Sequence, residues 1–204
     1  MAAKKKVLHP RPVLAPGARV VGIDLSLNST GVAVVGPDGT FERVGTVPGT
    51  APHGSDLVKL YERLDAVFDG IEALVGGFRT SDLVVIEKAL SHNSGPFGEM
   101  LANWHEVVGT LVRRGITVIP INPGTRAVYG SGGGKSDKSQ VVLQVERRFP
   151  TAKVANNDEA DAVILAAIGL HLAGCSIEPV PLPATHLSVD KLFEPLPVVE
   201  LAGA

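Results

Sequence analysis

The order of the apolar segments constrains the fold of this chain more than any other feature of the sequence. Three strand-length apolar runs come first, and the turn Gly36-Pro37-Asp38-Gly39 joins the second to the third as an antiparallel hairpin. Two more strands follow, and segments of helical periodicity alternate with them. The expected strands are residues 19–24, 30–35, 41–47, 83–87 and 116–121. This order predicts an α/β fold with a mixed five-stranded sheet, in which a three-stranded antiparallel meander precedes the alternating strands, and with helices on both faces.

Four segments carry apolar residues at helical spacing. They are residues 55–74, 97–114, 137–149 and 158–173. Ser55 is the expected N-cap of the first helix, and Gly115 is expected to end the second. The Gly-rich stretch from Tyr129 to Lys135 is expected to form a loop before the third helix.

The two ends of the chain differ in composition from its middle. Residues 1–18 carry four basic residues and no acidic one, and residues 175–204 contain five prolines. This composition predicts a basic disordered arm at residues 1–18 and a Pro-rich extended tail at residues 175–204. Residues 19–174 are then a single folded domain, which is an ordinary size for one hydrophobic core.

The composition excludes several classes of protein. Apolar residues make up 45% of the 204 residues and charged residues 20%, as in globular proteins. No run of 18 apolar residues is present, and prolines interrupt the segment where a signal peptide needs an apolar core, so no membrane association is expected. Cys175 is the only cysteine, which excludes a disulfide framework and a cysteine zinc site and favours a cytoplasmic location.

Acidic residues stand at the ends of two of the most apolar strands. Asp24 closes the first strand and Glu87 closes the fourth, although an unpaired carboxylate is costly beside a buried strand. Asp158 and Asp161 are three residues apart, which places them on one face of the last helix. Asp158 alone is also explained as an N-cap or first-turn residue, whereas Asp161 is not. Four carboxylates at one sheet edge favour hard divalent cations such as Mg²⁺ or Mn²⁺.

The acidic residues lie within motifs of a known family. The segment Gly22-Ile23-Asp24-Leu25-Ser26-Leu27-Asn28-Ser29-Thr30-Gly31-Val32-Ala33 resembles the first strand and turn of RuvC-type Holliday junction resolvases. Ile86-Glu87, Lys138-Ser139-Gln140-Val141 and Asp158-Glu159-Ala160-Asp161-Ala162 resemble three later motifs of that family, in the same order. The resemblance covers about residues 19–174 and implies an RNase H-like fold, in agreement with the order of elements.

The resemblance implies a function and a site. The chain would be a crossover junction endodeoxyribonuclease that cleaves four-way or other branched DNA with two Mg²⁺ ions, for which Mn²⁺ would substitute. Metal ligands would be Asp24, Glu87, Asp158 and Asp161. The residues facing DNA would be Arg126, Lys135, Lys138 and His92, with Lys138 also beside the scissile phosphate. The protein would be associated with the nucleoid of a bacterium or of a phage-infected cell.

A homodimer is expected as well. A four-way junction has two-fold symmetry and needs two nicks, so a symmetric dimer matches it. Family members pair through the helix at residues 97–114, whose apolar stripe is Met100, Trp104, Val107, Val108 and Leu111. Trp104 would anchor this interface. The alternative is that the whole stripe packs on the sheet of its own chain.

Some features depart from the bacterial family pattern and leave alternatives open. Leu90 stands where the bacterial enzyme has an aromatic side chain at the junction centre, and the Gly-rich loop and the tail have no close match. Such departures are typical of phage-borne relatives. A flap or fork nuclease, an RNA-processing relative, and a DNA-binding relative without activity therefore remain alternatives, although the presence of all four acids argues against the last.

Two nucleotide-binding hypotheses fail on the sequence. The P-loop motif requires a glycine where this chain has Tyr129, so Gly134-Lys135-Ser136 predicts a basic loop near DNA and no nucleotide cofactor. Actin-like ATPases share the strand-end aspartate but need two such domains, which this chain is too short to form. His92, His105 and His171 lack metal-ligand spacing and are expected on the surface or in packing contacts.

Charge is unevenly distributed along the chain. Residues 113–153 contain eight basic residues and two acidic ones, although the whole chain has a net charge of −2. Such a segment is typical of a polyanion-binding surface, and equally of solvated helix faces.

Overall fold

The computed structural model describes residues 7–49, 56–89, 97–133 and 138–195. Its sheet has five strands in the order β3-β2-β1-β4-β5. The strands are β1 (Val20–Asp24), β2 (Ser29–Val35), β3 (Phe41–Pro48), β4 (Leu83–Glu87) and β5 (Thr117–Ile121). β1, β2 and β3 form an antiparallel meander, whereas β4 runs parallel to β1 and β5 parallel to β4. The structure confirms the predicted mixed sheet.

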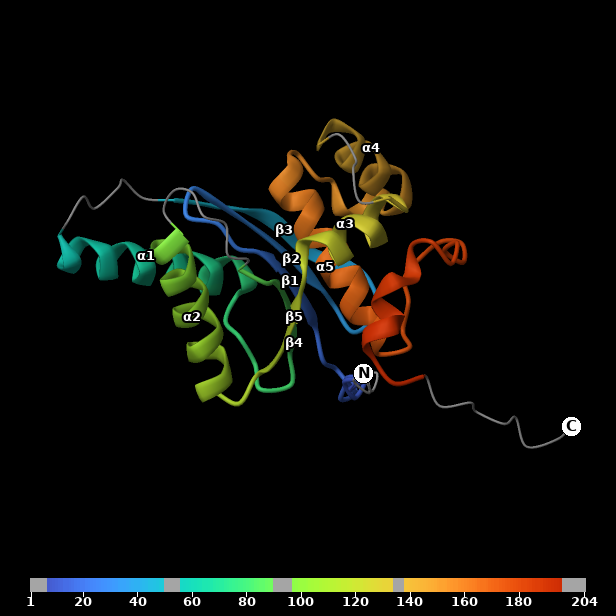
Figure 1. Ribbon diagram of the computed structural model, residues 1–204, viewed down its shortest axis with the longest axis horizontal. Helices are drawn as coiled ribbons and strands as arrows, with labels where there is room; N and C mark the ends of the chain where they lie inside the picture. The colour runs from blue at the N-terminus through green and yellow to red at the C-terminus, as the bar shows by residue number, and fades with distance from the viewer. Residues whose placement is uncertain (1–6, 50–55, 90–96, 134–137, 196–204) are drawn as a thin grey trace, which may run out of the picture.

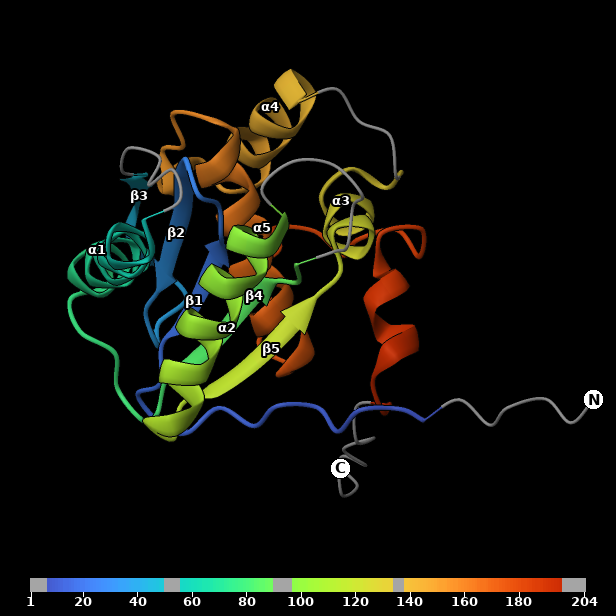
Figure 2. The same ribbon diagram turned by 60° about the vertical axis from the view of Figure 1, so that its left-hand side comes forward.

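Helices cover both faces of this sheet (Figures 1 and 2). One face packs on α1 (Leu57–Val75) and α2 (Phe97–Arg113), and the other on α5 (Asn157–Leu172). Around α5 lie the remaining helices: α3 (Pro123–Ser131), α4 (Lys138–Arg148), and the 3₁₀ helices η1 (Pro150–Ala152) and η2 (Leu187–Leu192). Alternate residues of the strands enter the two cores, as the period of a strand requires.

Helix α5 lies unusually close to the sheet because two glycines make room for its backbone. A Cβ atom on Gly22 of β1 would stand 2.0 Å from the carbonyl oxygen of Ala162. A Cβ atom on Gly31 of β2 would stand 1.9 Å from the carbonyl oxygen of Asp158. Both distances are shorter than any real contact, so only glycine allows this approach. The first turn of α5 is thereby placed beside the ends of β1 and β2.

The sequence missed one helix and misplaced one cap. Residues 123–131 form α3, so the prediction of a loop is wrong for Tyr129–Ser131. Pro123 fits the first turn because it needs no hydrogen-bond partner there, and Gly132 ends the helix with a left-handed φ of 74°. Asp56 caps α1 by accepting hydrogen bonds from two backbone amides, whereas the predicted cap, Ser55, lies outside the described residues.

The terminal segments pack on the domain, so the predictions of a disordered arm and an extended tail are wrong for parts of both. His9 forms a parallel β-bridge with Phe193, and Arg11 forms an ion pair with Asp190. Val189 of η2 is fully buried. Prolines prevent regular helices and strands, but they do not prevent isolated apolar side chains from reaching a core.

Candidate active site

Two of the predicted site residues are neighbours because two parallel strands end together. Ile23 pairs with Ile86 in the register of β1 and β4, so Asp24 and Glu87 follow directly at the same edge of the sheet. Arg126 lies on α3, which begins just after β5, the next strand in the sheet. Carboxyl ends of adjacent parallel strands are where α/β proteins commonly place a site.

The other two acids come from the first turn of α5. Asn156 is its N-cap and accepts a hydrogen bond from the amide of Glu159 at 3.0 Å. The Glu159 carboxylate in turn accepts a hydrogen bond from the amide of Ala155, the residue before the N-cap, at 2.6 Å. Asp158 is therefore not the N-cap. It remains a first-turn residue, and its carboxylate takes no part in these capping hydrogen bonds at the start of α5.

The charges of the other three acids act on Asp24 at this edge. The pKa of Asp24 rises from 3.8 to about 8, chiefly because of burial and further because of the charges of Glu87, Asp161 and Asp158. The Arg126 guanidinium opposes this effect. A negative charge at Asp24 is thus strongly unfavourable, which is the electrostatic condition under which carboxylates take up cations.

Arg126 supplies a positive charge inside this group of acids. Its guanidinium forms ion pairs with Glu87 and Asp161, and the side chain is only 14% exposed. Burial lowers the pKa of Arg126, but the two carboxylates outweigh it and raise that pKa above its ordinary value. The sequence placed Arg126 near DNA, and the ion pairs with two predicted metal ligands were not foreseen.

The four acids are suitable ligands for divalent cations, but in this structure they are not arranged as a metal site. Carboxylate oxygens are the donors that Mg²⁺ and Mn²⁺ prefer. Within the described residues, however, no three His, Cys, Asp or Glu side chains already converge as a metal site. Arg126 joins Glu87 to Asp161 in this structure.

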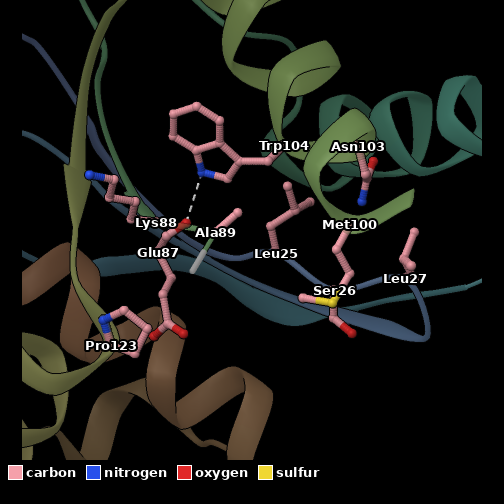
Figure 3. Close-up of a pocket in the computed structure, with 10 residues that line it drawn as sticks. All are labelled: Leu25, Ser26, Leu27, Glu87, Lys88, Ala89, Met100, Asn103, Trp104 and Pro123. Atoms are coloured by element: carbon pink, nitrogen blue, oxygen red, sulfur yellow. Dashed lines mark hydrogen bonds between the residues drawn. The ribbon is translucent and has the colours of Figure 1, made fainter. Parts of the chain in front are cut away.

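A pocket opens beside Glu87, between α2 and the loop that follows β1 (Figure 3). It has a volume of about 110 Å³. Its lining is Leu25, Ser26, Leu27, Glu87, Lys88, Ala89, Met100, Asn103, Trp104 and Pro123. The indole nitrogen of Trp104 donates a hydrogen bond to the backbone oxygen of Glu87 at 3.0 Å. Trp104 thus fixes the end of β4, a role that helical periodicity alone did not reveal.

The remaining predicted site residues are placed only in part. His92 and Lys135 lie outside the described residues, as does Leu90. Lys138 is the first residue of α4, so the predicted helix start is confirmed to within one residue, but the position of its side chain is not described.

Two further histidines contact neighbouring side chains. The ring of His171 lies 3.0 Å from the carboxylate of Asp190, and the ring of His105 contacts the edge of Trp104.

Comparison with known proteins decides the family. No protein-family model matches the chain. The crossover junction endodeoxyribonuclease RuvC of Clavibacter michiganensis subsp. michiganensis is 34% identical over 166 residues, which cover 78% of each chain. The RuvC of Acidiphilium cryptum is 30% identical over 158 residues, which cover 76% of this chain and 91% of that protein. The chain belongs to the RuvC family.

Solved structures confirm the fold expected for a RuvC-family protein. The structure of Thermus thermophilus RuvC in complex with a Holliday junction substrate matches with a TM-score of 0.57 at 16% identity, over 80% of this chain and 99% of that one. The yeast mitochondrial Holliday junction resolvase matches with a TM-score of 0.53 at 11% identity, over 80% of this chain and 82% of that one. RuvC-family nucleases depend on divalent metal ions. Among the helices of the described ranges, none is long and apolar enough to cross a membrane.

Proposed function

We propose that this RuvC-family endonuclease cleaves four-way DNA junctions at the sheet edge where Asp24, Glu87, Asp158 and Asp161 meet. The protein is a structure-specific nuclease whose partner is branched DNA, as its family membership implies. The observation that carries the site assignment is the proximity of the other three acids to Asp24, whose charges add to the effect of burial and raise its pKa to about 8. We propose Mg²⁺ as the metal, with two ions in each site.

The residues at this sheet edge and near it would have different roles in cleavage. When bound, two divalent ions supply an activated water and stabilise the oxygen that leaves. Asp24, at the end of β1, would hold both ions, and Glu87 and the pair on α5 would complete the ligands from either side. Lys138 would contribute positive charge beside the scissile phosphate, and Lys135 and His92 would contact the DNA backbone. Products would carry 5′-phosphate and 3′-hydroxyl ends.

We expect four-way junctions to be cleaved faster than flaps, forks or RNA–DNA hybrids of the same arm sequences. The reason is that two sites related by two-fold symmetry match the two symmetric strands of a junction. The measurement is the initial cleavage rate on each labelled substrate, with Mg²⁺ and with a chelator, which should stop cleavage on all of them. Faster cleavage of flaps than of junctions would favour the alternative flap nuclease.

The proposed dimer would use the outer part of the predicted stripe on α2. Val107 and Leu111 are fully buried in the core of their own chain, so they are not available to a partner. Trp104 and Val108 are half-buried, and Met100 remains 39% exposed. One turn beyond Val108, Val112 is 56% exposed and extends the same face.

Replacing Val112 by aspartate is therefore expected to halve the mass of the protein in sedimentation and to uncouple the two nicks at a junction. A charge at an apolar interface is costly to bury, whereas at an exposed position it leaves the fold intact. Val58→Asp is the matched control, because Val58 is an exposed valine, 68% accessible, on α1. A wild-type protein that sediments as a monomer with and without junction DNA would contradict the dimer.

A further inference from the structure

Helix α3 carries Arg126 to the acids, yet it is too short to hold its own position. It has nine residues, and isolated helices of this length are unstable in water. Its contacts with α5 include the ion pair of Arg126 with Asp161 and the close approach of Gly130 to Ile164. A Cβ atom on Gly130 would stand 2.6 Å from the Cδ1 atom of Ile164. The register of α3 on α5 therefore decides whether Arg126 reaches the acids.

The carboxyl end of α3 is capped by an arginine of α4. Arg148 donates hydrogen bonds from Nη1 to the carbonyl oxygens of Tyr129 at 3.2 Å and Gly130 at 2.8 Å. Its guanidinium also lies over the Tyr129 ring, 5.4 Å from the ring centroid. The last carbonyls of a helix lack partners within the helix, so a cation there stabilises the terminus. Arg148 thus acts on the last turn of α3.

Arg148 is itself held by the segment after α5, residues 176–195, which we name the C-terminal strap. Glu178 accepts hydrogen bonds from two nitrogens of Arg148, Nε at 3.0 Å and Nη2. The pair is well covered, with the Glu178 side chain 5% exposed and that of Arg148 14% exposed. A second strap residue, His186, places its Nδ1 atom 2.9 Å from the carbonyl oxygen of Tyr129. Removing one partner of such a covered pair leaves the other charge uncompensated.

The strap has further contacts with the rest of the domain, so its own position is fixed and it can hold α3. Figure 2 shows η2 of the strap beside α3, and the two helices are in contact. Val189 and Phe193 are buried in the core, and Asp190 pairs with both His171 and Arg11. The Acidiphilium RuvC aligns over 91% of its own length but over only 76% of this chain, so this chain contains residues without a counterpart in that relative.

We propose that the C-terminal strap positions the active site: Glu178, through Arg148, fixes α3 in the register at which Arg126 meets Glu87 and Asp161. Glu178 and Arg148 are positioning residues, since neither is placed at the acids. The effect of the strap on cleavage rests on the proposed function, whereas its effect on α3 does not.

Glu178→Gln tests the effect on cleavage, because glutamine keeps the shape of the side chain and removes its charge. We expect the cleavage rate at saturating junction DNA to fall about tenfold, with KM little changed, because Glu87 and Asp161 lose the guanidinium that holds them together as metal ligands. In an Arg126→Ala background the same substitution should have no further effect, because the strap acts through Arg126. A merely structural role predicts instead that the two rate losses multiply, and that result would overturn the proposal.

Amide hydrogen exchange tests the effect on α3 without reference to activity. In the Glu178→Gln protein, exchange at residues 124–132 should rise about tenfold, while exchange in α5 stays unchanged. Glu72→Gln is the matched control, because it removes the Glu72–Arg114 ion pair between α1 and the end of α2, away from α3. Unchanged exchange in α3 would overturn the strap proposal even if Asp24 is essential. Normal cleavage by Asp24→Asn, with raised exchange in Glu178→Gln, would instead refute only the proposed function.

Discussion

Replacing Asp24 by asparagine is expected to abolish junction cleavage and to stabilise the metal-free protein at pH 8. Cleavage is lost, by at least about a thousandfold, because Asp24 would hold both ions and asparagine carries no charge to bind them. Binding of junction DNA should persist or tighten, because one negative charge near the phosphates is removed. Cleavage under single-turnover conditions and a binding titration measure the two effects separately.

The stability change follows from the pKa of Asp24. Folding raises that pKa from 3.8 to about 8, so between these values the folded protein binds a proton that the unfolded chain does not. The free energy of unfolding of the wild type therefore falls as pH rises from about 4 to about 8, by at most about 1.4 kcal/mol per pH unit from this group. The asparagine side chain does not titrate, so the variant lacks this decline.

The free energy of unfolding of the Asp24→Asn protein should therefore exceed that of the wild type by a margin that grows with pH and reaches several kcal/mol at pH 8 in the presence of a chelator. Denaturant unfolding across this pH range measures it, and added Mg²⁺ should reduce it because the wild type gains the bound cations. Asp65→Asn, an exposed substitution on α1, is the control. Near wild-type cleavage by Asp24→Asn would contradict the four-acid site, and a stability difference independent of pH would contradict the buried charge.

Replacing Gly31 by alanine is expected to lower the cleavage rate at least about a hundredfold, because a shift of about 1 Å in catalytic groups has this effect. The added Cβ atom would stand 1.9 Å from the carbonyl oxygen of Asp158 and 2.3 Å from its carbonyl carbon. These are backbone atoms of α5, so the first turn of the helix must move away from Asp24. The free energy of unfolding should fall by about 3 kcal/mol, as for other overpacked sites.

Gly45→Ala is the matched control for this prediction. Gly45 lies in β3 opposite Val32, next to Gly31 in β2, and its added Cβ atom would meet only Leu74 side-chain atoms at 3.4 Å. Cleavage and stability should stay close to wild type. A Gly31→Ala protein that unfolds at the same denaturant concentration as the wild type and cleaves as fast would show that α5 does not depend on this close approach.

Much of the fold and of the proposed site was accessible from sequence because its causes are local. The hairpin follows from the residues of one turn, Gly36-Pro37-Asp38-Gly39, and the strands from short apolar runs. Asp24 and Glu87 were recognised because each ends such a run, and parallel strands bring their ends together. The hydrogen bonds between the N-cap Asn156 and Glu159 could also have been predicted from the spacing of the two residues, although they were not identified.

Other features depend on residues far apart in the chain, so no local sequence pattern predicts them. The glycines suggested a loop from Tyr129 to Lys135, but packing against α5 and caps from Arg148 and His186 make residues 123–131 a helix. The prolines of the tail suggested an extended chain, but Val189 and Phe193 find a core built by distant elements. The free energy gained by burying a few apolar side chains is larger than the local preference of the Pro-rich segment for an extended conformation.

The sequence by itself determined the order of the strands along the chain, the helices with clear periodicity and the four acids, because each depends on the residues of one segment. Only the tertiary structure decided where Arg126 points and which part of the α2 stripe stays exposed. It also decided how the strap reaches α3, through the pair of Glu178 and Arg148, 30 positions apart in the chain. Ion pairs and helix contacts of this kind arise from the relative placement of whole elements, and that placement is set by packing, which no single segment encodes.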